Sequence, residues 1–143
     1  MDAPRPVDAY GDAEHALVAY LGEAAWPPDV GPVRVVSVVP HDWTPREGYS
    51  VVQCAVDNTA HSSAWGGTSL AQEVLVRVTT WPAAVEGTTL GSPTRAKRLC
   101  RLAESVLFQW PGRSVVGVVG ATDPASGVPI ATCTVTVGRA PTY

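Results

Sequence analysis

Two neighbouring stretches in the middle of the chain show different hydrophobic periods. Within residues 72–81, Val74, Val76 and Val78 alternate with other residues, which is typical of a strand with one buried face. From Ser92 onward, apolar residues recur every three or four positions, which predicts an amphipathic helix. Ser92 is a good N-cap, Pro93 fits the first turn, and Pro111-Gly112 ends the pattern. The predicted apolar stripe comprises Ala96, Leu99, Cys100, Ala103, Val106, Leu107 and Trp110.

The same patterns predict the other elements. Residues 1–11 are expected to be extended, because Pro4 and Pro6 oppose a helix, and a helix is expected from Asp12 to about Ala25. Four further strands are predicted, at residues 32–39, 49–56, 113–119 and 129–137. The first two of these four are expected to form an antiparallel hairpin with a long tip at residues 40–48.

The predicted order of elements is therefore α-β-β-β-α-β-β. Amphipathic helices and half-buried strands need one another to cover their apolar faces. The expected fold class is α+β, with two layers: a mostly antiparallel sheet of about five strands, and two helices packed on one of its faces. A length of 143 residues, with 45% hydrophobic and 16% charged residues, suits one globular domain spanning residues 1–143.

One long polar segment interrupts this scheme. Residues 57–71 are small, polar and Gly-rich, which predicts a protruding loop between two strands. Trp65 lies within it, and a solvated loop has little use for a large indole ring. We predict that Trp65 is buried against another subunit, and we include His61 of the same segment among the candidate interface residues.

Composition narrows the function classes. The net charge of −3 and the pI near 5.5 argue against a general nucleic-acid-binding protein, which needs a basic surface. No apolar run approaches the ~20 residues of a membrane span, and the N-terminus lacks the features of a secretory signal. The cysteines Cys54, Cys100 and Cys133 are odd in number and widely spaced, which favours a reduced, cytosolic setting.

Catalytic and metal signatures are weak. No pair of His or Cys residues has the spacing of a metal site, and the three cysteines fall on predicted apolar faces, so we expect no metal and no cofactor. His61 and His41 stand near serine or aspartate residues, which leaves a small hydrolytic or ligand-binding domain as one alternative. No nucleophile elbow accompanies them. We expect the chain not to be an enzyme.

The second predicted helix has a basic outer side, formed by Arg95, Lys97, Arg98 and Arg101. It is interpreted either as a solvated helix face or as a surface that meets a neighbouring subunit or passing DNA. Arg77, on the off-core face of the central strand, is open to the same two interpretations. Arg77, Arg95, Arg98 and Arg101 therefore join Trp65 and His61 as candidate subunit contacts.

Four stretches of the sequence carry a resemblance to a known family: the first helix DAEHALVAYL, the strand PVRVVSVVP, the central EVLVRVTTW leading to TRAKRLCRLAESVL, and the closing strand ATCTVTVGR. In this order, from about Asp12 to Arg139, the chain resembles the tail-terminator (tail-completion) proteins of long-tailed bacteriophages, especially those of actinobacterial hosts.

The resemblance implies a structural role without catalytic residues. It implies a homo-hexameric ring at the head-proximal end of the tail tube, which stops tube growth and meets a neck or head-completion protein. It also implies that genome DNA passes through the lumen without sequence-specific binding, and that the protein resides in the virion tail after assembly in the host cytoplasm. The alternative in the same class is a neck or head-completion protein on the capsid side.

Overall fold

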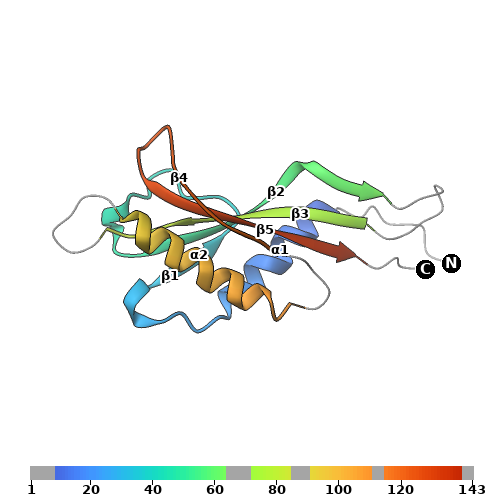
Figure 1. Ribbon diagram of the computed structural model, residues 1–143, viewed down its shortest axis with the longest axis horizontal. Coiled ribbons are helices and arrows are strands. Elements are labelled where there is room, and N and C mark those ends of the chain that lie inside the picture. The colour runs from blue at the N-terminus through green and yellow to red at the C-terminus, as the bar shows by residue number, and fades with distance from the viewer. Residues whose placement is uncertain (1–8, 64–71, 85–90, 111–114, 140–143) are drawn as a thin grey trace.

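The computed structural model describes residues 9–63, 72–84, 91–110 and 115–139. They form two α-helices and five strands in the predicted order α-β-β-β-α-β-β (Figure 1). The elements are α1 Ala9–Gly22, β1 Val33–Val36, β2 Ser50–Ser63, β3 Gln72–Trp81, α2 Pro93–Leu107, β4 Val115–Thr122 and β5 Pro129–Arg139. Two short 3-10 helices, η1 Pro28–Val30 and η2 Pro45–Glu47, lie in the connections.

The five strands form one open sheet in the order β1-β2-β3-β5-β4. The pairs β2–β3, β3–β5 and β5–β4 are antiparallel, and the pair β1–β2 is parallel. The predicted α+β fold class is thus confirmed. Helix α2 connects β3 to β4, and β5 is inserted between those two strands.

One alternating set of strand residues faces the main core. Val76, Val78 and Thr80 of β3 alternate along the strand and so point to the same side. Their register partners on β5 are Val135, Cys133 and Ala131, and β2 contributes Val52 and Cys54. The apolar members of this set form one buried cluster with Leu17 and Leu21 of α1 and with Leu99, Cys100, Ala103 and Leu107 of α2. Burial of this apolar surface is the main stabilising contribution.

Helix α2 begins as its sequence predicts and is anchored by a buried hydroxyl. The side chain of Ser92 accepts a hydrogen bond from the Arg95 backbone N–H at 3.0 Å, which satisfies one orphan donor of the first turn. The hydroxyl of Thr80 lies 2.9 Å from the Ala96 carbonyl and 3.3 Å from that of Ala131, joining β3 to the helix and to β5. The regular helix ends at Leu107, three residues before the predicted end.

Helix α1 starts earlier than predicted. It begins at Ala9, so the expectation of an extended segment is wrong for residues 9–11, and Asp12 lies inside the helix instead of capping it. Residues 1–8 lie outside the described part. One side chain ties this helix to the sheet: a carboxylate oxygen of Glu14 accepts a hydrogen bond from the Val56 backbone N–H at 2.8 Å. This donor sits where the β2–β3 register shifts, so Glu14 satisfies a group beside an irregularity in the ladder.

The predicted antiparallel hairpin of the first two strands is wrong. Strand β1 spans only Val33–Val36 and runs parallel to β2, with Val33 opposite Ser50. The connecting loop therefore has to return along the sheet before β2 begins. Trp43 and Pro45 are buried within that loop, and the Trp43 indole N–H donates to the Tyr49 carbonyl at 3.2 Å. Burial of these two rings stabilises the loop conformation. A tight hairpin turn could not connect β1 to β2, because parallel strands need a longer crossover connection.

The predicted loop at 57–71 is also wrong in its first half. Strand β2 continues to Ser63, and His61, Ser62 and Ser63 pair with Val74, Glu73 and Gln72. The partner strand β3 supplies ladder hydrogen bonds, and this tertiary pairing overrides the low strand propensity of small polar residues. Residues 64–71, including Trp65, lie outside the described residues. Strands β2, β3 and β5 reach together to one end of the long axis (Figure 1).

Candidate functional site

The predicted basic side of α2 is not a free surface. The two terminal guanidinium nitrogens of Arg95 donate to backbone carbonyls, Nη1 to Ala83 at 3.3 Å and Nη2 to Asp29 at 3.0 Å. Arg98 binds the Asp29 carboxylate with two nitrogens, Nε to Oδ2 and Nη2 to Oδ1, the latter at 3.0 Å. Arg95 and Arg98 thus have partners within their own chain, which neither interpretation of the basic side included. They fix η1 to the first half of α2.

Lys97, Arg101 and Arg77, the other candidate cations, lie in different surroundings. Lys97 lies across β4, because a Cβ atom built on Gly120 would come within 2.6 Å of the lysine Cε. Arg101 is exposed on α2, and Arg77 is exposed on β3 between its register neighbours Ala55 and Thr134. Arg77 and Arg101 have the exposure that an interface residue needs, and so does Arg98, although Arg98 also pairs with Asp29.

The ion pair between Arg98 and Asp29 predicts an acid-dependent contribution to stability. Hydrogen bonding and charge from Arg98 hold the pKa of the Asp29 carboxyl below its ordinary value of 3.8. In the unfolded chain this carboxyl takes up its proton at the higher, ordinary pKa. The contribution is therefore present above pH 3.8 and is lost as the pH falls through the lower, folded pKa. The stability difference between the natural chain and Asp29→Asn is expected to shrink over this range.

Urea unfolding at pH 7 and at successively lower pH values below 4 measures this difference. The matched control is Arg101→Ala, which removes an exposed cation of the same helix. Because both side chains of the pair are about half exposed, the effect at pH 7 is that of a surface ion pair. A difference between Asp29→Asn and the natural chain that stays constant down to pH 2 would contradict the role given to Arg98.

Two interface candidates from the 57–71 segment cannot be placed by their side chains. Trp65 lies outside the described residues, so its predicted contact with another subunit stays a prediction. His61 belongs to β2, where its backbone pairs with Val74, but its side chain lies outside the described part. The other four tryptophans pack within their own chain. Trp110, for instance, meets Tyr20 edge to face with ring centroids 4.7 Å apart.

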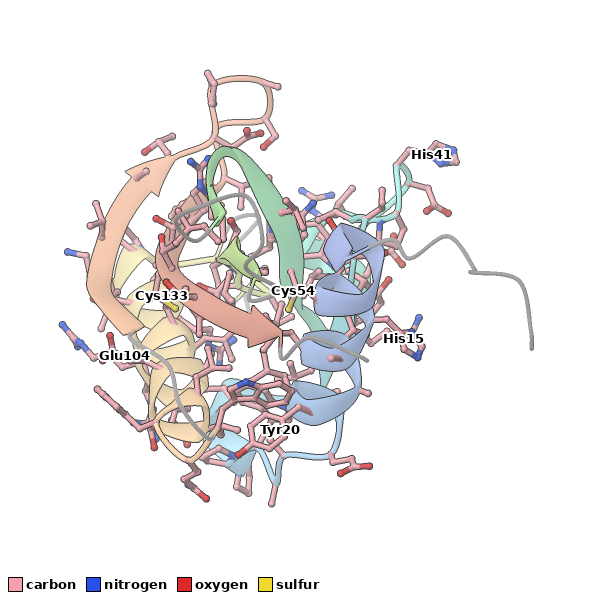
Figure 2. The ribbon with its side chains drawn as sticks, turned by 90° about the vertical axis from the view of Figure 1, so that its right-hand side faces the viewer. His15, Tyr20, His41, Cys54, Glu104 and Cys133 are labelled. Carbon is pink, nitrogen blue, oxygen red and sulfur yellow. The ribbon has the colours of Figure 1, made fainter. Side chains whose placement is uncertain are left out.

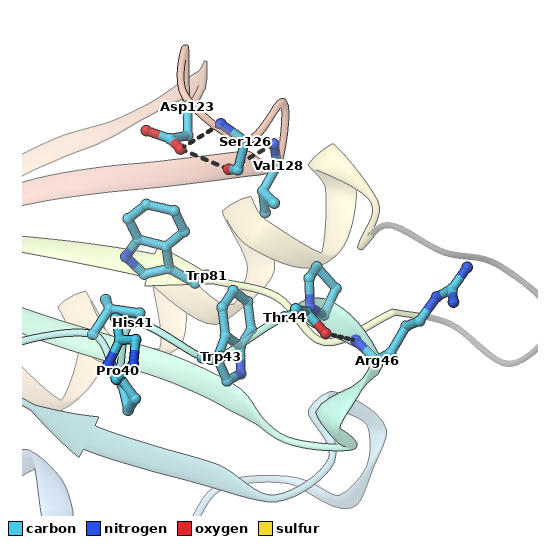
Figure 3. Close-up of a pocket in the computed structure, with 11 residues that line it drawn as sticks. Pro40, His41, Trp43, Thr44, Arg46, Trp81, Asp123, Ser126 and Val128 are labelled. Carbon is cyan, nitrogen blue, oxygen red and sulfur yellow. Dashed lines mark hydrogen bonds between the residues drawn. The ribbon is translucent and has the colours of Figure 1, made fainter.

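A pocket of about 550 Å³ lies where three distant segments meet (Figure 3). These are the loop that precedes β2, the last residue of β3, and the turn between β4 and β5. Its apolar wall consists of Val39, Pro40, Trp43, Pro45, Trp81 and Val128. No local sequence pattern predicted this pocket, because its three parts are far apart in the chain. The one available signal was Trp43 within a Pro-rich loop.

The polar rim of this pocket does not have the geometry of a catalytic triad. The Ser126 hydroxyl donates directly to Asp123 Oδ2 at 2.6 Å, and the Ser126 backbone N–H donates to the same oxygen at 3.0 Å. In a triad a histidine stands between serine and carboxylate. Here His41 is exposed and lies across the pocket from this pair, with Trp81 between them (Figure 3). Asp123 and Ser126 instead fold the turn that leads into β5.

The three cysteines are buried, free thiols of the core, as their positions on apolar faces predicted. Cys54 and Cys133 flank Val78 from the two neighbouring strands (Figure 2). Burial, and then the nearby Glu14 charge, raises the pKa of Cys54 to about 12. A hydrogen bond with Cys100, together with burial, raises the pKa of Cys133 as well. The thiols of Cys54 and Cys133 therefore stay protonated and unreactive at neutral pH.

The described residues contain no group of three or more His, Cys, Asp or Glu side chains arranged to hold a metal ion. In the same part of the chain, neither helix has the length and apolar character needed to cross a bilayer.

No known family model matches the chain, and no curated protein shows significant sequence similarity to it. The function therefore has to rest on the geometry of the described residues and on the resemblance drawn from the sequence.

Proposed function

We propose that this chain is a structural tail-terminator protein of a long-tailed bacteriophage. In this proposal, copies of the chain form a homo-hexameric ring on the head-proximal end of the tail tube. The ring ends polymerisation of the tube protein and joins the tube to a neck or head-completion protein. Genome DNA passes through its lumen, and the protein stays in the virion after assembly in the host cytoplasm.

The observation that carries the proposal is an open sheet edge. Strand β4 is the last strand of the sheet, so one side of its backbone has no strand partner among the described residues. Its sequence, VVGVVGAT, contains no charged residue and no proline, and Val119 is 61% exposed. Two features restrict pairing to part of this edge: Lys97 of α2 lies across Gly120, and the β4–β5 register shifts between Val116 and Val119. The rest of the strand supports association with another copy through backbone hydrogen bonds.

The opposite edge of the sheet, strand β1, is less suited to pairing with another copy. Strand β1 has four residues, and its exposed Arg34 places the guanidinium carbon 4.1 Å from the centre of the Tyr49 ring. A short edge strand with a charged residue discourages pairing. A contact that uses β4 on one copy and a different surface on the next is heterologous, and heterologous contacts form a ring when the rotation between copies closes.

The order of elements gives a second line of support. The sequence resemblance rests on the succession α-β-β-β-α-β-β, and the helices and strands of the described chain follow that succession. The mildly acidic composition, with a net charge of −3, also suits a channel that DNA slides through without binding.

Deletion of the gene in the virus that encodes this chain tests the proposal. Loss of a tail terminator is expected to leave tubes of uncontrolled, excessive length that fail to join heads, as seen by electron microscopy. Native mass spectrometry of the purified chain is expected to show a six-copy ring. Tails of normal length beside heads that have lost their DNA would indicate the head-completion alternative. Normal, joined particles would refute both roles.

A further inference from the structure

The pocket between Trp43, Trp81 and the β4–β5 turn has the chemistry of a site for a proline-containing peptide. The two indole rings meet edge to face, with centroids 6.2 Å apart and an angle of 77° between their planes. Pro40 and Pro45 extend this wall. Pro side chains pack well against aromatic faces, and a polyproline II segment keeps its carbonyl groups free to accept hydrogen bonds. A tryptophan-lined groove is the usual place for such a segment to dock.

One atom in the wall lacks a hydrogen-bond acceptor. The indole nitrogen of Trp81 is buried and has no partner in the described part of the chain. By contrast, the Trp43 indole already donates to the Tyr49 carbonyl. A buried donor without an acceptor costs about 1–3 kcal/mol. Because this nitrogen is buried, an occupant of the pocket reaches it only after the side chains that cover it have moved, so the choice of a peptide rests on the aromatic wall and on the charges of the rim.

The charges around the pocket select the occupant. Both hydrogen bonds from Ser126 go to one oxygen of Asp123, and the other carboxylate oxygen accepts none from the described residues. Arg46 lines a separate part of the rim (Figure 3). The chain itself carries a matching segment, residues 1–8, in which Pro4 and Pro6 flank Arg5 and aspartates stand at both sides. An arginine between two prolines fits an aromatic pocket with a free carboxylate oxygen on its rim.

We propose that this pocket binds the N-terminal segment, residues 1–8, of a second copy of the chain. The segment leads into α1, whereas the pocket lies at the end of the long axis where β2 begins and the β4–β5 turn stands (Figure 1). A donor copy beside the pocket supplies Pro4 and Pro6 to the two indole rings and Arg5 to Asp123. The inference deepens the proposed ring and rests on the self-association which that ring requires, but not on a role in a virus.

A peptide titration tests the site without any ring. The receptor is the full chain carrying Pro4→Ala and Pro6→Ala, so that its own segment does not compete, and it is diluted until sedimentation shows a monomer. A synthetic peptide with the sequence of residues 1–8 is expected to bind saturably, as measured by calorimetry and by tryptophan fluorescence. A peptide with both prolines replaced by alanine, and one with Arg5→Glu, are expected to bind at least tenfold more weakly. Trp81→Leu in the receptor removes one of the two aromatic rings of the wall, and is expected to weaken binding several-fold.

Failure of the peptide to bind, or equal binding of the alanine peptide, would overturn the site. Equal binding of the Arg5→Glu peptide would overturn the choice of occupant in favour of some other proline-rich segment. Chains that carry Arg5→Lys place an amine where the arginine meets Asp123, and carbodiimide treatment of a mixture of unlabelled and ¹⁵N-labelled copies of this variant tests the exchange between copies. Products that join one labelled and one unlabelled chain are expected, and products within single chains alone would overturn that exchange.

The two proposals fail separately. Peptide binding by a chain that forms no ring would leave this site standing and refute the tail-terminator role. A six-copy ring that binds no peptide, and whose assembly is unaffected by Pro4→Ala and Pro6→Ala, would refute the site alone.

Discussion

Replacement of Val119 by lysine is expected to abolish ring formation while leaving the fold intact. Val119 is 61% exposed on β4, so a lysine there can extend into solvent without entering the core. In an assembly that pairs β4 with another copy, the same lysine would bring a charge to the new strand pair. Lysine on an edge strand is a common natural device against pairing, because its charge must otherwise be desolvated.

Native mass spectrometry at the same protein concentration compares the ring fraction of Val119→Lys with that of the natural chain, and circular dichroism checks the fold. The matched control is Val38→Lys, at a valine that is 72% exposed but lies beyond the end of β1. The control is expected to assemble normally. A ring that forms equally well with Val119→Lys would show that the β4 edge is not the contact, and the main structural support for the proposed function would be lost.

Leu99→Ala is expected to give the largest loss of stability. Leu99 is fully buried on α2, in the cluster that joins both helices to β2, β3 and β5. Removing its side chain loses the burial of three carbon groups and leaves a cavity between elements that are each held by other contacts, so the site can collapse only in part. Substitutions of this type cost about 2–5 kcal/mol.

Urea unfolding followed by fluorescence measures the change in the free energy of unfolding. Leu102→Ala is the matched control, because Leu102 occupies the same helix with only part of its side chain buried against the cluster. The control is expected to lose less than half as much stability. Equal losses for the two variants would mean that α2 packs on the sheet with a different face.

The sequence was most informative where the signal is local. The N-cap Ser92, the following proline and the three- and four-residue period together predicted the start of α2, and the structure shows that cap. Alternation predicted that Ala131, Cys133 and Val135 of β5 face the core, and all three are buried. Each of these signals depends on residues within one or two turns of chain, which is the range over which local propensity and burial pattern act.

Non-local pairing was the part that escaped prediction. A hydrophobic period says that residues form a strand, but it does not state the direction of the neighbouring strand, so the parallel pairing of β1 with β2 was missed. The basic side of α2 was misjudged for the same reason. The partner of Arg98 is Asp29, 69 residues away, in a short 3-10 helix that no sequence pattern singled out. The pocket likewise arises only when its three segments meet.

The place of β5 in the sheet has a consequence for synthesis of the chain. Of the five strands of the sheet this one is made last, yet it lies between β3 and β4 and supplies three of the buried residues of the core cluster that includes α2. A nascent chain that has emerged only as far as β4 contains β3 and β4, which have no bond to each other, and a helix α2 without the support of β5. The sheet therefore becomes continuous only after the ribosome has released residues 129–139. Until then neither edge of β4 has a strand partner. Pairing of β4 strands between neighbouring nascent chains is therefore the expected route to aggregation during synthesis.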